Sequence, residues 1–332
     1  MLWIEKYRPV KFEEICGQGE VLRHMQKFAS EKNVPHLLIF GPHGTGKSVA
    51  LESMAGDLYG GYLDENLSII PSGVLFRQGK SWLENEDRFS HLYMKDESLI
   101  TNFKHIVKWY ASMKPLDADF KIVVFEEASS LPFDAQAALR RIMERYSQTC
   151  RFVFIAKQQT SIIPAIASRC LPLFFSPLEA EEIISVMQNV LRKEGVLPGT
   201  VSDDDLEIIA QLSRGDCRKA LIYLQVMVTK GGDVDFSEIT GSETSAISSS
   251  LFSYLMKGDL KRSKEIAEML MTEYGLSGTD VVLEISKAAK REYNDKRIAV
   301  ALSDADHNLC HAGNEFIQVN ALLARVIKEV FN

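Results

Sequence analysis

The stretch HLLIFGPHGTGKSVALES spans residues 36–53 and decides how the first part of the chain folds. It begins with a short apolar run, which predicts a strand buried on both faces. GPHGTGKS at 41–48 then matches the phosphate-loop pattern of glycine, four residues, glycine, lysine and serine or threonine. A helical pattern follows without a break. This order predicts an α/β domain with a phosphate-binding site at the end of the strand.

The phosphate loop supplies the first group of candidate binding residues. Its glycines allow successive backbone N–H groups to point toward a phosphate. Lys47, also a catalytic candidate, would bridge the β and γ phosphates of a nucleotide, and the Ser48 hydroxyl would ligate Mg²⁺. A chance Gly-rich turn is the alternative. The sequence therefore predicts ATP and Mg²⁺ as cofactors, with binding contacts from Gly41, Pro42, His43, Gly44, Thr45, Gly46, Lys47 and Ser48.

A second apolar run, KIVVFEE at 121–127, ends in two glutamates. A site that hydrolyses a nucleotide needs acidic groups beside the phosphate loop to hold the metal and orient water. We assign Glu126 to Mg²⁺ together with Ser48, and Glu127 to the role of catalytic base. Glu126 is one methylene longer than the aspartate usual at such a position, which would slow hydrolysis and spare binding. Two solvated residues at a strand end are the alternative.

The remaining pattern divides the chain into three parts. RFVFIA at 151–156 predicts another strand, and apolar residues at helical spacing predict a helix over 134–146. After about residue 172 the pattern is helical, and the Gly-, Ser- and Asp-rich segment 230–245 predicts a linker. The expected domains are an α/β nucleotide-binding domain at 1–171, a helical lid at 172–232 and a further helical domain at 233–332.

Composition excludes several classes of protein. Of the 332 residues 46% are hydrophobic and 25% charged, which excludes a disordered or collagen-like chain. No apolar run approaches the roughly 20 residues of a membrane span, and the first residues have no signal-peptide pattern. Five cysteines without a close pair predict reduced thiols in a cytoplasmic protein and no structural zinc. The net charge of -7 argues against a surface that is positively charged all over, but not against a local basic surface.

Five segments together resemble one known family, the small subunits of replication factor C, an AAA+ clamp loader. They occur in the family's order and spacing between residues 3 and 225. The last two resemble the family's Ser-Arg-Cys motif and its second sensor. The segments are WIEKYRP (3–9), FEEICGQ (12–18), AQAALRRIMERYS (135–147), IIPAIASRC (162–170) and GDCRKAL (215–221).

The resemblance implies a fold and an activity. The fold would be an AAA+ phosphate-loop NTPase domain with a parallel sheet, a small helical lid and a C-terminal helical collar. The activity would be that of an ATPase subunit in a ring that opens the sliding clamp and loads it onto primer-template DNA during replication. Expected partners are the large and small replication factor C subunits, the clamp and primer-template DNA, without a membrane. An archaeal member would be associated with the nucleoid.

The resemblance also implies roles for particular residues. Arg169 becomes an arginine finger that acts in trans on the ATP of a neighbouring subunit, because a guanidinium can neutralise charge on the transferred phosphoryl group. Arg218 becomes the second sensor, which reaches the nucleotide from the lid. A surface salt bridge and a helix-surface charge are the respective alternatives. The residues implied on the adenine side, unless they are only structural, are Tyr7, Arg8, Pro9 and Gln18.

Two catalytic positions depart from the family's pattern. Lys157 stands where the first sensor is usually asparagine, and a lysine cannot accept a hydrogen bond from the attacking water. Glu126 is the second departure. We expect a subunit that binds ATP well, hydrolyses it poorly and activates a neighbour through Arg169. The alternatives are a non-hydrolysing scaffold subunit of the same loader and a different AAA+ remodeller.

The segment FRQGKSWLENEDRFSHLYMKDES at 76–98 is longer than in the common small subunit. It is similar to the divergent second small subunit of some archaea. In this family the subunits contact DNA through its phosphate groups and do not read the base sequence. Lys104 and Lys108 are therefore candidate DNA-binding residues. Arg77 and Lys80 in the long segment are further candidates. A solvated charged helix face is the alternative for each.

Overall fold

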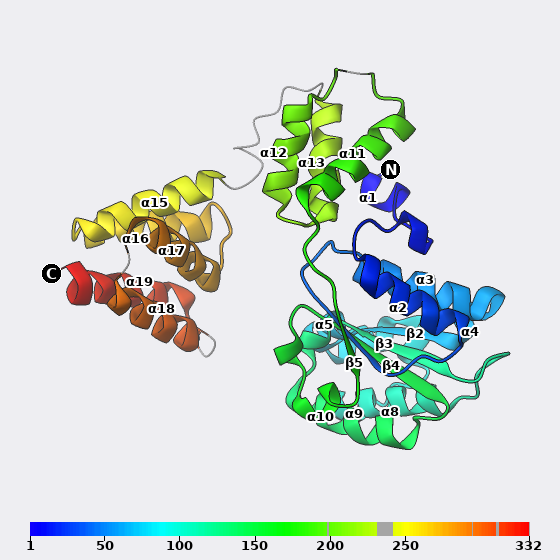
Figure 1. The fold of residues 1–332 in the computed structure, drawn as a ribbon. Helices are drawn as coiled ribbons and strands as arrows, with labels where there is room; N and C mark the ends of the chain where they lie inside the picture. Colours follow the sequence, from blue (N-terminus) through cyan, green and yellow to red (C-terminus); the bar gives the residue numbers. More distant parts are fainter. Residues whose placement is uncertain (198, 231–241, 294, 310–311, 332) are drawn as a thin grey trace. The chain divides into compact units, whose positions relative to one another are not determined.

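The computed structural model describes residues 1–197, 199–230, 242–293, 295–309 and 312–331. The chain forms two compact units, Met1–Asp233 and Val234–Asn332. The first unit contains a sheet with helices on both faces, and the second consists of helices (Figure 1). Most of the linker predicted at 230–245 lies outside the described residues.

The sheet in the described part of the chain has five strands in the order β2-β3-β4-β1-β5, and every neighbouring pair is parallel. The three predicted strands are present, and β2 and β5 were not predicted. Their runs are short, each contains a proline, and both lie at the sheet edges, where burial is incomplete. The strands are β1 (Leu37–Phe40), β2 (Leu67–Pro71), β3 (Lys121–Glu126), β4 (Cys150–Ala156) and β5 (Leu171–Phe174).

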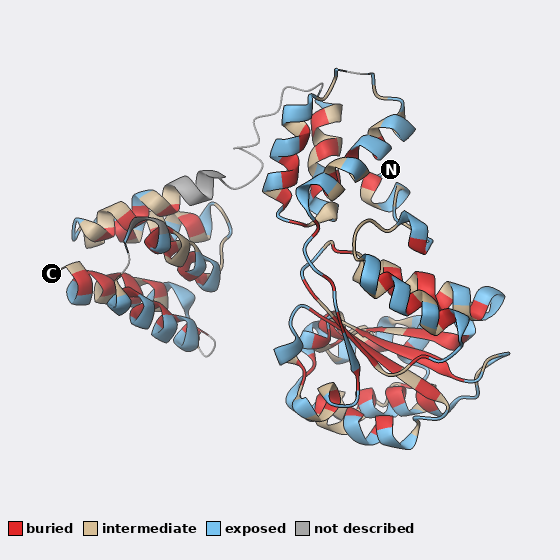
Figure 2. Cartoon of the chain, viewed as in Figure 1, coloured by how far each residue is buried: buried red, intermediate tan, exposed pale blue. Residues whose placement is uncertain are grey.

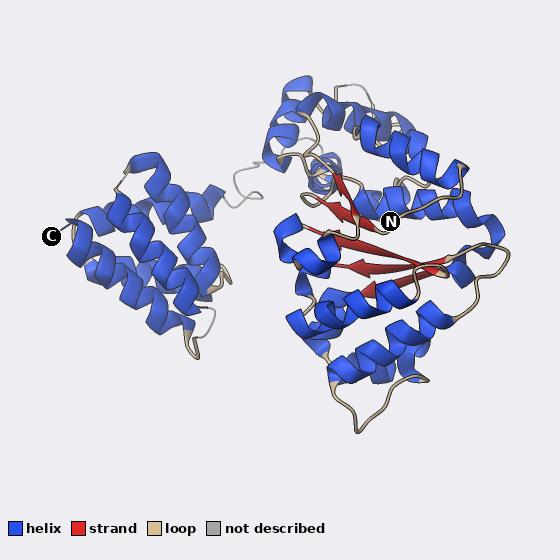
Figure 3. Cartoon of the chain, turned by 60° about the horizontal axis from the view of Figure 1, so that its bottom comes forward, coloured by secondary structure: helices blue, strands red, loops and turns tan. Residues whose placement is uncertain are grey.

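Helices cover both faces of the sheet, as Figures 1 and 3 show. One face carries α2 (Gly19–Ser30) and α3 (Lys47–Tyr59), and the other carries α8 (Leu99–Ser112), α9 (Phe133–Arg145) and α10 (Pro164–Ala167). Side chains alternate along β3, so Ile122 and Val124 join one apolar core and Val123 and Phe125 the other. The remaining short elements of the first unit are α1 (Trp3–Lys6), η1 (Phe12–Glu14), η2 (Gly60–Tyr62), α4 (Leu63–Asn66), η3 (Ala128–Ser130) and η4 (Gln159–Ser161).

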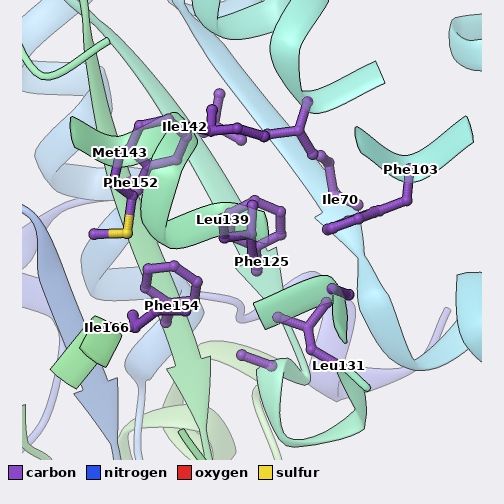
Figure 4. Packing of buried hydrophobic residues seen from close by; sticks show 14 of the residues in the cluster. Ile70, Phe103, Phe125, Leu131, Leu139, Ile142, Met143, Phe152, Phe154 and Ile166 are labelled. Carbon is purple, nitrogen blue, oxygen red and sulfur yellow. The ribbon is translucent and has the colours of Figure 1, made fainter. Parts of the chain in front are cut away.

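Aromatic rings from the central strands fix the position of α9. Phe125 of β3 stacks on Phe154 of β4, with ring centroids 5.1 Å apart and planes at 19°. Leu139 and Met143 of α9 belong to the same buried cluster, as Figure 4 shows. Buried residues line one side of α9 and its charged residues are exposed (Figure 2), as the sequence predicted, whereas Phe133 at its first position is exposed. The sheet therefore holds α9 rigidly by its apolar face.

The long segment at 76–98 folds into short helices that pack beside α8. These are α5 (Ser72–Gln78), α6 (Lys80–Asn85) and α7 (Asp87–Ser90). Leu83 and Phe89 are buried in the same core as α8. The segment ends in a turn held by the fully buried Asn102, whose amide accepts from the Met94 N–H at 2.7 Å and donates to the Met94 carbonyl at 2.9 Å.

After β5 the chain forms the helices α11 (Ala180–Glu194), α12 (Asp203–Ser213) and α13 (Cys217–Thr229). The N-terminal helix α1 is attached to them. The Trp3 N–H donates to Gln225 Oε1 at 2.9 Å, and the Tyr7 hydroxyl donates to Glu194 Oε1 at 2.8 Å. The first residues of the chain therefore belong with the helices expected to form the lid.

The second unit is helical throughout its described residues, which confirms the prediction for this region. Its helices are α15 (Ser242–Met256), α16 (Leu260–Thr272), α17 (Gly278–Glu292), α18 (Lys296–Leu309) and α19 (Glu315–Val326), followed by a π-helical turn, η5 (Ile327–Phe331). Leucine, isoleucine and valine side chains from these helices form a separate apolar core. No helix in the described residues of either unit is long and apolar enough to span a membrane.

We predict that Asn102→Ala destabilises the first unit by about 2 kcal/mol, because it removes a fully buried side chain that makes two hydrogen bonds to the Met94 backbone. Chemical denaturation followed by tryptophan fluorescence measures the change. Asn85→Ala is the control, since Asn85 makes an exposed bond to the Ser81 carbonyl and its loss should cost less than about 0.5 kcal/mol. Equal effects of the two substitutions would contradict the assignment.

Candidate nucleotide-binding site

The phosphate loop follows β1 directly, and its shape requires glycine at two positions. Gly41 has φ 144°, and a Cβ there would lie 2.1 Å from the Phe175 carbonyl oxygen. Gly44 has φ 67°, and a Cβ there would lie 1.8 Å from Asp216 Oδ1. Larger residues would therefore displace β5 or the start of α13. The close approach brings the lid helix α13 against the loop, where the Cys217 N–H donates to the Gly44 carbonyl at 3.3 Å.

Lys47 lies at the start of α3 with its ammonium group folded onto the loop. Nζ donates to the Gly41 carbonyl at 2.8 Å and to the Pro42 carbonyl, and it lies 3.5 Å from Thr45 Oγ1. Burial lowers the pKa of Lys47 to about 8, although the nearby Asp216 carboxylate opposes the shift. The ammonium group is thus held beside the loop, where a phosphate could replace the carbonyl oxygens as its partner.

Ser48 and Glu126 meet, as the sequence predicted for the metal site. The Ser48 hydroxyl donates to Glu126 Oε1 at 3.0 Å, although the two residues are far apart in sequence. Both supply oxygen atoms, which are the ligands that Mg²⁺ prefers. The donor set therefore fits Mg²⁺ beside a nucleotide phosphate. The described residues contain no group of three or more histidine, cysteine, aspartate or glutamate side chains that would hold a metal by themselves.

Glu127 turns away from Ser48. Its backbone is left-handed, with φ 48°, and its carboxylate lies 3.8 Å from the Arg77 guanidinium. A Cβ on Gly73 would lie 1.8 Å from Glu127 Oε2, so the side chain rests against α5. The candidate base is therefore adjacent to the metal site in sequence but engaged with α5 in this conformation. Arg77, a candidate for DNA contact, is occupied by the same ion pair.

Four charged groups surround the His43 imidazole at the loop. Burial lowers the pKa of His43, and the positive charges of Lys157, Lys47 and Arg218 lower it further, whereas Asp216 opposes them. Lys157 follows Ala156, whose carbonyl accepts from the Gly41 N–H at 3.3 Å. The candidate first sensor, the candidate second sensor and the phosphate-loop lysine therefore all lie close enough to His43 to lower its pKa. Such a group of cations suits a polyanionic ligand.

Arg169 lies near the amino ends of the strands, whereas the phosphate loop lies at their carboxyl ends. It precedes β5, and the Leu171 N–H donates to the His36 carbonyl at 2.8 Å, beside the start of β1. The phosphate loop follows the other end of β1, roughly 13 Å away at the usual rise per residue. The Arg169 guanidinium forms an ion pair with Glu144 at 2.6 Å. Arg169 therefore cannot serve the nucleotide site of its own chain.

The residues predicted on the adenine side connect the lid helices with the sheet domain. Tyr7 contacts Glu194 of α11, whereas Arg8 pairs with Glu52 of α3 at 2.5 Å. Gln18 donates to the Ser176 carbonyl at 2.7 Å and accepts from the Ser176 N–H at 3.1 Å. Pro9 lines a cavity of about 770 Å³ together with Glu52 and Gly56 of α3. Ile15 of the same N-terminal segment approaches the phosphate loop, and its Cγ2 lies 3.2 Å from the position of a Cβ on Gly46.

The candidate DNA-binding lysines lie one helical turn apart on α8. Lys104 and Lys108 are both exposed on the side of that helix away from the core. Lys80 donates to the Lys95 carbonyl at 3.3 Å within the neighbouring segment. Their exposure leaves the ammonium groups of Lys104 and Lys108 accessible to a phosphate.

Sequence reasoning missed the roles of Asp216 and Glu144. Asp216 lies inside the segment GDCRKAL, and an aspartate ahead of a helical run is a sign of an N-cap. The structure confirms that cap, since its carboxylate accepts from the Arg218 N–H at 3.0 Å. Glu144 lies on the exposed side of the helix predicted over 134–146, and nothing in the sequence pairs it with Arg169.

We predict that ATP affinity falls as pH rises through about 8, because the lysine at position 47 then loses the charge that attracts the phosphates. A bound triphosphate raises the pKa of this lysine, so binding above this pH includes proton uptake. Titration with a fluorescent ATP analogue from about pH 7 to about pH 9.5 measures the effect. Lys47→Arg stays charged throughout and should remove the dependence. The same pH dependence in this variant would contradict the assignment.

Comparison with known proteins identifies the family. The model "Replication factor C C-terminal domain" matches residues 244–325, and "DNA polymerase III, delta subunit" matches residues 17–179. A replication factor C small subunit from Archaeoglobus fulgidus is 34% identical over 97% of this chain and 96% of its own length. One from Methanococcus vannielii is 32% identical over 98% of both chains.

Solved structures support the same fold. A variant of RuvB from Thermotoga maritima superposes with a TM-score of 0.51 at 16% identity, covering 85% of this chain and 87% of its own. The ORC1 protein from Aeropyrum pernix, solved in complex with DNA, gives a TM-score of 0.54 at 15% identity over 98% of this chain and 95% of its own. At this identity the likeness shows the AAA+ fold alone. The curated relatives match nearly the whole chain, so the chain belongs to the replication factor C small-subunit family.

Proposed function

We propose that this subunit binds Mg²⁺ and ATP at its own phosphate loop and supplies Arg169 to the ATP held by a neighbouring subunit of the clamp loader. The observation that carries the proposal is the position of these two groups at opposite edges of one rigid sheet. In a ring of such subunits, each edge would face a different neighbour. Hydrolysis would then depend on assembly, because every complete site would need residues from two chains.

The chain's own residues would bind and orient the triphosphate. Backbone N–H groups of the loop 41–48 would hold the phosphates, and Lys47 would exchange its carbonyl partners for phosphate oxygens. Ser48 and Glu126 would hold Mg²⁺, which neutralises charge on the β and γ phosphates. Arg218 at the start of α13 would bring the lid helices against the nucleotide. Tyr7, Arg8, Pro9 and Gln18 would border the adenine side.

Hydrolysis at this site would be slow, for two reasons seen in the side chains. Glu127 would have to leave Arg77 before it could orient a water molecule. Lys157 adds a positive charge near the loop but cannot accept a hydrogen bond from that water. Both features favour ATP retention over turnover. A purely structural subunit that supplies only Arg169 is the second candidate function, and the altered first sensor favours it.

The wider assignment follows the family. The subunit would assemble with large and small replication factor C subunits and act on the sliding clamp at primer-template DNA. The exposed lysines Lys104 and Lys108 would follow the DNA phosphates. The segment at 76–98 supports placement with the divergent second small subunit of archaea. The division into a nucleotide-binding domain, a lid and a collar, at 1–171, 172–232 and 233–332, is part of the same proposal.

Two substitutions separate the two roles. Lys47→Ala should abolish ATP binding by the isolated chain, whereas Arg169→Ala should leave that binding within about twofold, because its side chain is remote from the loop. In the reconstituted loader with clamp and primed DNA, Arg169→Ala should lower ATP turnover at least about tenfold. Steady-state phosphate release and filter binding measure both effects. A large loss of binding in the Arg169 variant would contradict action in trans.

We predict that Lys157→Asn raises ATP hydrolysis by the assembled loader several-fold, since an amide oxygen could orient the attacking water. The measurement is turnover in a complex whose other subunits carry inactivated phosphate loops. Lys219→Asn is the matched control, because it removes an exposed lysine of α13 that has no assigned catalytic role. Equal turnover in the Lys157 variant and the wild type would contradict a limiting role for Lys157 and shift attention to Glu126 and Glu127.

A further inference from the structure

Glu144 lies on the exposed face of α9 and contacts two arginines. Its Oε1 accepts from an Arg169 terminal nitrogen at 2.6 Å and from Arg140 Nε at 3.3 Å. The other terminal nitrogen of Arg169 donates to the Ala165 carbonyl at 2.6 Å. Hydrogen bonds from Arg140 and then from Arg169 lower the pKa of Glu144, so the carboxylate is charged at neutral pH. The Arg169 guanidinium is thus held by one charged and one neutral partner.

The segment that carries Arg169 is fixed along α9 at both ends. At its start, the buried Gln136 accepts from the Ile163 N–H at 2.9 Å and donates to the Ser161 carbonyl at 3.2 Å. At its end, Glu144 holds Arg169. Gln136 and Glu144 are on the same helix, roughly 12 Å apart along its axis. Between them Ile166 of α10 is fully buried in the core that contains Phe154, as Figure 4 shows.

The charges in this cluster leave Arg169 able to act on a phosphate. Arg140 and Arg169 share one carboxylate, so the three side chains together keep a net positive charge. A single partner carboxylate would otherwise neutralise the guanidinium completely. Arg169 also retains N–H groups beyond the two that these contacts use. The cluster therefore orients the guanidinium without cancelling the field that it presents to a neighbouring chain.

We propose that Glu144 is a positioning residue that holds the Arg169 guanidinium in the direction required to reach the ATP of the neighbouring subunit. This inference rests on the proposed function, because it requires Arg169 to act in trans. A long arginine side chain free in solvent would lose rotamer freedom at the moment of reaction. The Glu144 ion pair removes that cost before the neighbour arrives, and displacement of the guanidinium by about 1 Å would slow the reaction strongly.

A double-mutant cycle in the reconstituted loader with clamp and primed DNA tests the inference. Glu144→Ala should lower the maximal ATP turnover about tenfold, with KM for ATP unchanged, because nucleotide binding does not involve this edge. In the Arg169→Ala background the same substitution should change turnover by less than about twofold, since no guanidinium remains to be positioned. Glu144→Gln, which still accepts a hydrogen bond, should recover part of the loss.

Glu31→Ala is the matched control, because Glu31 is also an exposed glutamate paired with a cation one turn away, at 3.7 Å. Thermal unfolding and size-exclusion chromatography of each variant verify folding and assembly. Equal losses from Glu144→Ala with and without Arg169 would overturn the inference, as would unchanged turnover in Glu144→Ala. If Arg169→Ala itself leaves turnover unchanged, the proposed function fails, and the inference fails with it.

Discussion

The parallel pairing of β1 with β4 and β5 is the constraint on which the rest of the structure depends. Because the strands run in one direction, their carboxyl ends meet at one edge of the sheet, which is where such folds bind ligands. The phosphate loop follows β1, Glu126 is the last residue of β3 and Lys157 follows β4, so all three lie at these carboxyl ends. The same pairing puts Arg169, which precedes β5, at the amino ends of the strands. A single arrangement thus separates the residues that would bind ATP from the residue that would act on a neighbour.

The apolar core under α9 fixes the distance between the phosphate loop and Arg169. Phe125 and Phe154 stack within the sheet, and the apolar face of α9 packs on them. The opposite face of α9 then carries Glu144, which contacts Arg169. Because protein cores are close-packed, α9 cannot shift without disturbing the strands. The edge with Arg169 is therefore as well defined as the edge with the phosphate loop.

Much of the fold and part of the site were predictable from sequence. Continuous apolar runs predicted β1, β3 and β4 because these strands are buried on both faces, and helical spacing predicted α9 because one face of this helix is apolar. The sequence assigned Ser48 and Glu126 to one metal site, and the structure brings these two side chains together at 3.0 Å. The edge strands β2 and β5 were missed because their runs are short and each contains a proline, so they carry little pattern. The engagement of Glu127 with Arg77 had no signal in either segment.

By itself the sequence determined the local chemistry of this protein: a glycine-rich loop after a strand, two glutamates at a strand end and the ordered motifs of replication factor C small subunits. These depend on neighbours in the chain, where steric and hydrogen-bonding rules apply directly. Only the tertiary structure decided which charges meet. The contact of Asp216 with the phosphate loop, the grouping of Lys157 and Arg218 at His43, and the hold of Glu144 on Arg169 all join residues far apart in sequence. Such contacts follow from packing and strand order, which no local pattern contains.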